Sequence, residues 1–185
     1  MCRELQLLFR ADRDERANHP AYGTPEYREL RELDAQRRRR LAVIVESGGL
    51  KEPEDYYQAA WILNHGESVD EIWQAHTLAK EAVELGLRCA RWLAAATYDR
   101  WLMYQGKPQK YGTQIVPDGK RQRVWDVDPA TSDAERADWD VPTLAEMERR
   151  AGEVTRNEPM PPLDAAPEWL RDALLRWRAE DERRA

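Results

Sequence analysis

The sequence predicts a mainly α-helical protein, built as an antiparallel array of helices with one small β-hairpin. Apolar residues recur at intervals of three and four along most of the 185 residues, which is the spacing of one helix face. Proline, serine or threonine precedes several of these segments and glycine follows them, as at helix starts and ends. Residues 113–125 depart from this period, and Asp118-Gly119 in their middle predicts a hairpin turn.

Composition and charge limit the classes of function. A chain of this length forms one domain, or one domain with appended segments, and its eight tryptophans argue against disorder. The net charge of -6 does not attract nucleic acid, so we expect no nucleic-acid partner. The basic run 37–40 lies inside a helical pattern. A solvated helix face is its first interpretation, and a local nucleic-acid or acidic-lipid patch is the second.

The cysteines and the apolar segments predict a soluble, cytoplasmic protein. Cys2 and Cys89 make no disulfide framework, and Cys89 is most simply a packed thiol. Arg3 and Glu4 interrupt the start, where a signal peptide would need an apolar run to follow. No stretch approaches the ~20 apolar residues of a membrane span. We expect no membrane partner, no cofactor and no metal.

The first three predicted helices have recognisable ends. Residues 3–18 form a short helix with apolar contacts near its start. Residues 24–47 begin with a Thr-Pro cap and end at two glycines. Residues 53–65 begin with a proline and end at Gly66, and they are apolar almost all round, which is typical of a buried helix.

The next two helices form a hairpin of small residues. Residues 68–86 begin with a capping box, in which Ser68 and Glu71 each cap the other's backbone. Residues 88–105 are again apolar on most sides, and their alanines allow close approach of a neighbouring helix. Gly106 and the proline two residues later end this helix.

The pattern then changes. A hairpin at 113–125 must lie on the helices, because two strands alone are marginally stable. Residues 126–141 are predicted to be irregular. Thr143 and Glu146 form another capping box, which opens a helix to about Arg150.

The sequence divides the chain into a domain and an appendage. Residues 1–152 are predicted to form the helical domain. Residues 153–166 are polar and proline-rich and predict a linker. Residues 167–185 predict a last helix with a frayed, charged end. We therefore expect the chain after about Glu153 to be peripheral.

A pattern of small residues with one leucine runs through the central hairpin: Ala75, Ala79, Ala82, Gly86, Ala90, Leu93 and Ala94. This pattern resembles one unit of the tetratricopeptide and Sel-type helical repeats, whose small residues let two antiparallel helices pack closely. At most one more degenerate unit is present, so a full superhelical array is not expected.

A second resemblance covers about residues 5–150. It is carried by Asp12-Arg13-Asp14-Glu15-Arg16, Asp55-Tyr56-Tyr57, His65-Gly66, Asp99-Arg100 and the run from Gly106 to Gln114. These segments resemble a family of uncharacterised bacterial domains, whose pattern pairs Gln-His-Gly and Asp-Arg steps with Gly-Lys-Pro-Gln-x-Tyr-Gly-Thr-Gln. Arg13 and Asn64 replace two glutamines of that pattern, so no amide role is carried over to them. The resemblance implies membership and no particular activity.

His65, Asp99 and Tyr111 form the candidate catalytic set. His65 ends a buried helix, where it is either a structural histidine or a general base. Asp99 lies on an apolar stripe, and a carboxylate there needs a partner. We consider three partners for it: a histidine, Arg16, or backbone N–H groups of residues 109–114. The alternative to a catalytic pocket is a buried network that pins this loop to the helices.

The candidate ligand-binding residues are Arg100, Lys107, Gln109, Gln114, His76 and Arg16. The amides and hydroxyls around Gly112, with these cations near them, suit an anionic group. His76 lies on the inner stripe of its helix, where a satisfied core histidine is the first interpretation. His65 and His76 lack the spacing and the further ligands of a metal site.

Two functions from different classes follow. The first is a binding or interaction protein of unknown partner, in which the polar loop is structural or contacts that partner. The second is a small cofactor-independent enzyme acting on an anionic small molecule or peptide. In it His65 is the base, Asp99 orients it, Tyr111 donates a proton, and Arg100 or Lys107 binds the substrate.

Overall fold

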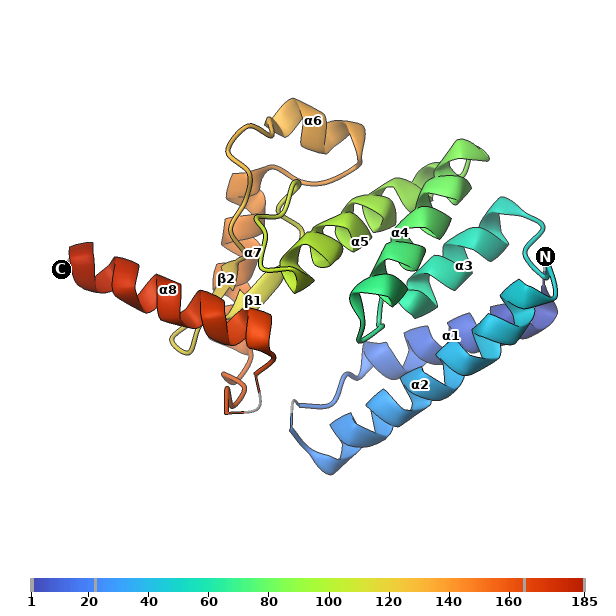
Figure 1. The fold of residues 1–185 in the computed structure, drawn as a ribbon, viewed down its shortest axis with the longest axis horizontal. Helices are drawn as coiled ribbons and strands as arrows, with labels where there is room; N and C mark the ends of the chain where they lie inside the picture. Colours follow the sequence, from blue (N-terminus) through green and yellow to red (C-terminus); the bar gives the residue numbers. More distant parts are fainter. Residues whose placement is uncertain (1, 22, 165, 185) are drawn as a thin grey trace. The chain divides into compact units, whose positions relative to one another are not determined.

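The computed structural model describes residues 2–21, 23–164 and 166–184, and it confirms a mainly helical fold with one small hairpin (Figure 1). The elements in chain order are α1 (Arg3–Ala17), α2 (Pro25–Glu46), α3 (Pro53–Leu63), α4 (Val69–Glu84), the 3-10 turn η1 (Arg88–Ala90), α5 (Arg91–Tyr104), β1 (Ile115–Pro117), β2 (Gln122–Val124), α6 (Asp133–Asp138), α7 (Leu144–Asn157) and α8 (Glu168–Arg184).

The chain divides into two compact units, Met1–Tyr98 and Asp99–Ala185. This division differs from the one expected from the sequence, which placed the boundary near residue 152. Each unit has its own hydrophobic core.

The caps predicted for the first unit are present. The Thr24 hydroxyl accepts a hydrogen bond from the N–H of Tyr27, 3.2 Å away. Ser68 and Glu71 cap each other at the start of α4. The start of α3 has a capping box as well, in which Asp55 accepts from the N–H of Glu52 at 3.0 Å. These side chains satisfy N–H groups that a helix leaves without partners.

Small and branched apolar side chains fill the core of the first unit. They come from α1, α2, α3 and α4: Leu5, Leu41, Ile44, Ala59, Ile62, Leu63 and Ala75. Ala79 and Ala82 continue this buried stripe along α4. Cys89, predicted to be packed, is instead exposed, because it falls in η1 and outside the buried face of α5.

The hairpin lies where the sequence predicts it, within residues 113–125. β1 and β2 are antiparallel, with Ile115 opposite Val124 and Pro117 opposite Gln122. In the connecting turn, Gly119 has a φ of +90°, a conformation that favours glycine. The expected support by helices is confirmed within the second unit, where the N–H of Gln122 donates to the Thr155 hydroxyl of α7 at 2.8 Å.

Part of the region predicted to be irregular is helical. α6 begins after Ser132, whose hydroxyl accepts from the N–H of Glu135 at 3.2 Å. The spacing Ser132-x-x-Glu135 is a helix-start signal that could have predicted it. α7 also continues to Asn157, beyond the predicted end near Arg150.

The expectation of a peripheral C-terminal segment is wrong. Leu170, Leu174 and Trp177 of α8 are buried in one cluster with Met103, Val116 and Trp125. The indole of Trp177 also donates to Asp126 at 3.0 Å. The apolar stripe of α8 therefore completes the core of the second unit, and residues 158–167 connect two packed helices.

No helix within residues 2–21, 23–164 and 166–184 is long and apolar enough to cross a membrane.

Removal of α8 should unfold the second unit. A chain ending at Glu158 keeps α7 complete but loses Leu170, Leu174 and Trp177, and each large buried side chain contributes about 2–5 kcal/mol. We expect the cooperative unfolding of the second unit to disappear in calorimetry and its near-UV circular dichroism to be lost. A chain ending at Ala179, which loses only the charged end of α8, is the control and should melt as the full chain does. A cooperative transition retained in the shorter chain would contradict a core role for α8.

Candidate functional site

Asp99 is the centre of the polar signature in the second unit. Its side chain is fully buried, and its carboxylate accepts four hydrogen bonds from the loop that follows α5. Oδ1 accepts from the N–H groups of Lys110 and Tyr111, both at 2.8 Å. Oδ2 accepts from the N–H of Thr113 at 2.9 Å and from its hydroxyl at 2.8 Å. Of the three partners considered for this carboxylate, the backbone N–H groups are the ones found.

The loop conformation aims its amides at one carboxylate. Gly106 ends α5 with a φ of +69°, so the chain turns back toward Asp99. Gly112 has a φ of +87°, and a Cβ there would lie 3.3 Å from the Leu144 side chain. Successive N–H groups that converge in this way form a concave anion-binding turn. In this chain the anion that the turn holds is Asp99 itself.

Gln109 and Gln114 are used inside the same network. The Gln109 amide, fully buried, donates to the carbonyl oxygens of Gln114 at 3.2 Å and Trp125 at 2.8 Å. Its Oε1 accepts from the N–H of Gln114 at 2.8 Å. The Gln114 side chain accepts from Arg100 Nε at 3.1 Å and donates to the Thr113 hydroxyl at 2.9 Å. These groups fasten the loop to the strand end and to α5.

Arg136 is a member of this network that the sequence analysis missed. Its guanidinium is buried and donates to the carbonyl oxygens of Tyr111 at 2.9 Å and Thr131 at 2.8 Å. Asp133 supplies the counter-charge at 3.1 Å. Because α6 positions Arg136, recognition of α6 would have been needed to predict it.

Of two further predicted site residues, Tyr111 is buried and Lys107 is exposed. The Tyr111 ring is buried against Trp139, with ring centroids 6.0 Å apart, so its main chain rather than its ring contacts Asp99. Lys107 is exposed, donates to Gln105 at 2.8 Å and lies over the Trp101 ring at 5.5 Å.

The electrostatics of Asp99 combine two opposed effects. Burial raises the pKa of its carboxyl above the ordinary value, and the hydrogen bonds from Tyr111, Thr113 and Lys110 act in the lowering direction. A carboxylate has about four positions at which it can accept a hydrogen bond, and the four donors of the loop occupy all of them in Asp99. To orient a histidine, as the enzyme hypothesis requires, Asp99 would have to give up one of these bonds.

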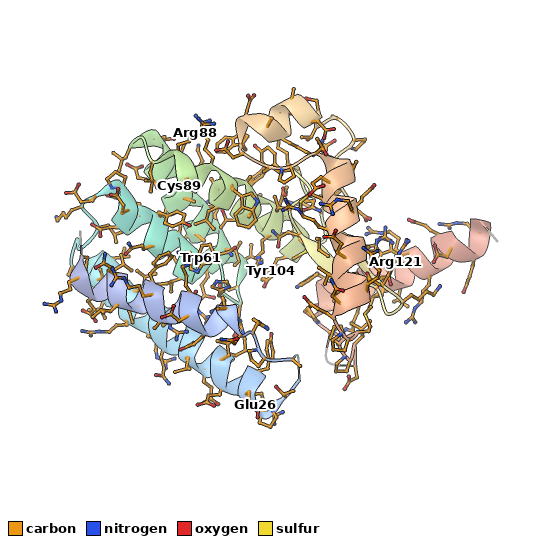
Figure 2. All side chains as sticks on the ribbon, turned by 180° about the vertical axis from the view of Figure 1, so that it is seen from behind. Glu26, Trp61, Arg88, Cys89, Tyr104 and Arg121 are labelled. Atoms are coloured by element: carbon orange, nitrogen blue, oxygen red, sulfur yellow. The ribbon has the colours of Figure 1, made fainter. Side chains whose placement is uncertain are left out.

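A second polar cluster lies in the first unit, around Asp12. This carboxylate, 1% exposed, accepts from Arg16 at 2.5 Å and from the Trp61 indole at 2.7 Å. The same Arg16 forms a forked contact with Asp34 at 2.9 and 3.0 Å. Figure 2 shows Trp61 on α3, within the first unit. Arg16, predicted to bind a ligand, thus links α1 to α2 in this structure.

Part of the basic run 37–40 belongs to this cluster and not to a solvated face. Arg37 is buried and pairs with Glu15 at 2.5 Å. Arg38 pairs with Glu71 at 2.9 Å and donates to the carbonyl oxygen of His65 at 3.0 Å. The first interpretation of the run is therefore wrong for these two arginines.

His65 lies beside Asp12, with Nε2 3.6 Å from Asp12 Oδ2. Its ring meets the Trp61 ring edge to face, at a centroid distance of 6.1 Å. Burial raises the pKa of the Asp12 carboxyl, against the lowering effect of Arg16 and the Trp61 hydrogen bond. Asp12 is thus the carboxylate that the structure places next to this histidine.

His76 is a half-buried histidine at a helix–helix contact. Its Nδ1 lies 2.9 Å from the carbonyl oxygen of Ala94, so it donates there as the Nδ1–H tautomer. The rings of Trp73 and Tyr98 lie near the His76 ring, at centroid distances of 5.3 and 5.1 Å. Burial lowers the pKa of His76, and the hydrogen bond to Ala94 opposes this effect.

The predicted residues therefore fall into two separate groups of contacts. The group in the second unit consists of Asp99, Arg100, Gln109, Tyr111 and Gln114. The group in the first unit consists of His65 and Arg16, which both contact Asp12. A catalytic site of His65, Asp99 and Tyr111 would join residues of both units, and it stays a prediction.

No protein-family model, no curated protein and no solved structure matches this chain.

Replacement of Asp99 by alanine should destabilise the second unit. Three N–H groups, two of them buried, and one buried hydroxyl would lose their acceptor, and each such loss at a buried group costs about 1–3 kcal/mol. We expect a loss of roughly 3 kcal/mol or more in urea unfolding. Asp164→Ala, at an exposed position of the same unit, is the control and should leave the midpoint unchanged. Equal midpoints for the two variants would contradict the anchoring role.

His76 should contribute a pH dependence to stability. Because its folded pKa is lowered, its contribution is complete above the unfolded pKa of about 6.5 and is lost as the pH falls toward the folded pKa. We therefore expect the stability difference between the wild type and His76→Gln to be constant above about pH 7.5 and to shift against the wild type below about pH 6.5. Asp12 and Asp99 titrate in both proteins, so their effects cancel. A difference independent of pH between 5 and 8 would contradict the burial of His76.

Proposed function

We propose that this chain is a helical binding protein for a small molecule and that its polar signature is structural. The observation that carries the proposal is the internal use of that signature. The four acceptor positions of Asp99 bind the loop's own groups, and the amides of Gln109 and Gln114 bind the loop, Trp125 and Arg100. A catalytic or ligand-binding role would require these buried groups to be released, at a cost of about 1–3 kcal/mol each.

Two hollows of the second unit support a binding role. One, of about 320 Å³, is lined by the aromatic residues Tyr104, Trp125 and Trp169 and by the carboxylates Glu168 and Asp172, among others. The other, of about 580 Å³, lies between β2 and α7. Both volumes are in the range of small-molecule sites. Their described linings contain no histidine and no cysteine, so neither offers the usual base or nucleophile.

The helical hairpins of the first unit are compatible with the proposal. The buried alanines of α3 and α4 support the tetratricopeptide-like arrangement suggested by the sequence, in which helical hairpins serve as a scaffold for binding. We also propose a cytoplasmic location and membership of the uncharacterised bacterial family that the sequence resembles.

An acid–base enzyme is the second candidate, and one contact favours it. The His65 ring nitrogen lies 3.6 Å from Asp12, a distance that a small rearrangement would convert to a hydrogen bond. In this version Asp12, rather than Asp99, would orient the histidine. The substrate would then have to reach the cluster around Asp12.

A ligand screen with chemical analysis separates the two functions. A ligand at 100 times its Kd stabilises a folded protein by about 2.7 kcal/mol, so we expect at least one class in a panel of small anions and ammonium compounds to raise the Tm saturably. Mass spectrometry should recover that ligand unchanged, and His65→Gln should bind it with the same affinity. Consumption of the ligand by the wild type, abolished in a folded His65→Gln, would overturn the binding proposal and support the enzyme.

A further inference from the structure

The hollow between β2 and α7 concentrates positive charge in a protein whose net charge is -6. We call it the arginine groove. It is lined by Arg121, Gln122, Arg123, Val124, Glu148, Ala151, Gly152, Thr155 and Arg156. Three guanidinium groups and one carboxylate give this lining a formal charge of +2, from +3 and -1. Arg121 extends from the hairpin, as Figure 2 shows.

Arg156 has no ion pair or hydrogen bond to any residue in the described part of the chain. Other arginines of α7 behave differently. Arg149, outside the groove, contacts both Glu146 and Glu153, and Arg150 contacts Glu146 at 3.1 Å. The glutamates of α7 therefore pair with Arg149 and Arg150, and Arg156, the arginine of this helix that lines the groove, has no acidic partner in the described part of the chain.

The two arginines of the hairpin, Arg121 and Arg123, are weakly paired with carboxylates. The Arg123 guanidinium stacks on the Trp177 ring, 4.0 Å from its centroid, which fixes the plane of its fork. Its closest carboxylate oxygen, on Asp126, is 3.7 Å away, and Asp126 already accepts from Arg176 and Trp177 at shorter distances. Arg121 lies 3.5 Å from Asp118, beyond the usual length of a charge-assisted hydrogen bond.

Thr155 and Gly152 of α7 shape the side of the groove that this helix forms. Thr155 accepts from the N–H of Gln122 and donates to the carbonyl oxygen of Ala151 at 2.8 Å, which fixes the spacing between α7 and β2. Gly152 lies inside α7, where glycine weakens a helix relative to alanine. A Cβ atom on residue 152 would lie 3.5 Å from Nη1 of Arg156. Glycine at this position therefore leaves the space next to the guanidinium unfilled.

We infer that the arginine groove binds a small, soluble oxyanion that carries two or more phosphate or carboxylate groups. This inference rests on the proposed binding function and names the ligand class of one of its two hollows. Guanidinium forks match phosphate and carboxylate groups with two parallel hydrogen bonds, and three of them around one hollow suit a multiply charged ligand. The single carboxylate, Glu148, disfavours a ligand that covers the entire lining with negative charge, such as a nucleic-acid strand.

Calorimetric titration of the full chain with inorganic pyrophosphate and with citrate tests the inference. We expect saturable one-to-one binding of at least one of them at low ionic strength, weaker at 0.3 M salt. Arg156→Gln should weaken it about tenfold or more, without a change in Tm, because Arg156 has no partner to lose. Arg149→Gln, on the same helix but outside the groove, is the matched control and should bind within twofold of the wild type.

Gly152→Ala provides a second, independent variant. It should raise the Tm through better helix propensity and still weaken binding, because the added methyl group occupies space next to the Arg156 guanidinium. A variant that is more stable but binds less tightly excludes misfolding as the cause.

Four results would overturn the inference. The first is that neither anion binds, and the second is that binding is equal in Arg156→Gln and Arg149→Gln. The third and fourth are that only vesicles of anionic lipid, or only a single-stranded oligonucleotide, bind. If one of these results is found but the ammonium compounds of the ligand screen still raise the Tm, the proposed binding function stands and only the inference about the arginine groove fails. If no compound does, both proposals fail.

Discussion

The second unit depends on how a single buried carboxylate is satisfied. Asp99 would destabilise its helix if it were left without donors, because an ionised group away from water needs several hydrogen bonds. The loop at 110–113 supplies four of them, and this fixes the direction in which the chain enters β1. The hairpin then brings Trp125 into the core, where its indole donates to the carbonyl oxygen of Lys107 at 2.8 Å. The arginine groove is bordered by the second strand of this hairpin, so its shape follows from the same anchor.

The local signals were sufficient for most helices and for the hairpin, and insufficient for long-range packing. Caps such as Ser68 act within four residues, and they are visible in the sequence for that reason. The place of α8 depends on Trp177 meeting Trp125 and Asp126 across about 50 positions, a contact that no local pattern encodes. The polar, proline-rich residues 153–166 suggested that everything after them is a peripheral tail. The helix that follows them nevertheless carries a clear apolar stripe in the sequence.

The candidate sites show the same limit. The sequence identified Asp99 as a carboxylate in need of a partner, and the loop N–H groups were among the partners considered. It could not place Asp12 beside His65, because the two are 53 positions apart, with Asp12 in α1 and His65 in the turn after α3. Nor could it separate Arg37, buried in an ion-pair network, from exposed Arg40 in the same basic run. The charge pattern along a helix shows which of its residues are charged. Whether a charged residue is buried depends on the neighbouring helix, which the pattern does not identify.

The most direct measurement of the central claim is hydrogen exchange at the individual amides of Lys110, Tyr111 and Thr113 in the native protein. If Asp99 anchors the loop, these three N–H groups exchange only when the second unit unfolds, and their protection equals that of the core amides of α5 and β2. Exchange at the rate of an exposed loop, faster than that of those core amides by several orders of magnitude, would contradict the account. In that case the polar signature would be open to solvent and available for another function.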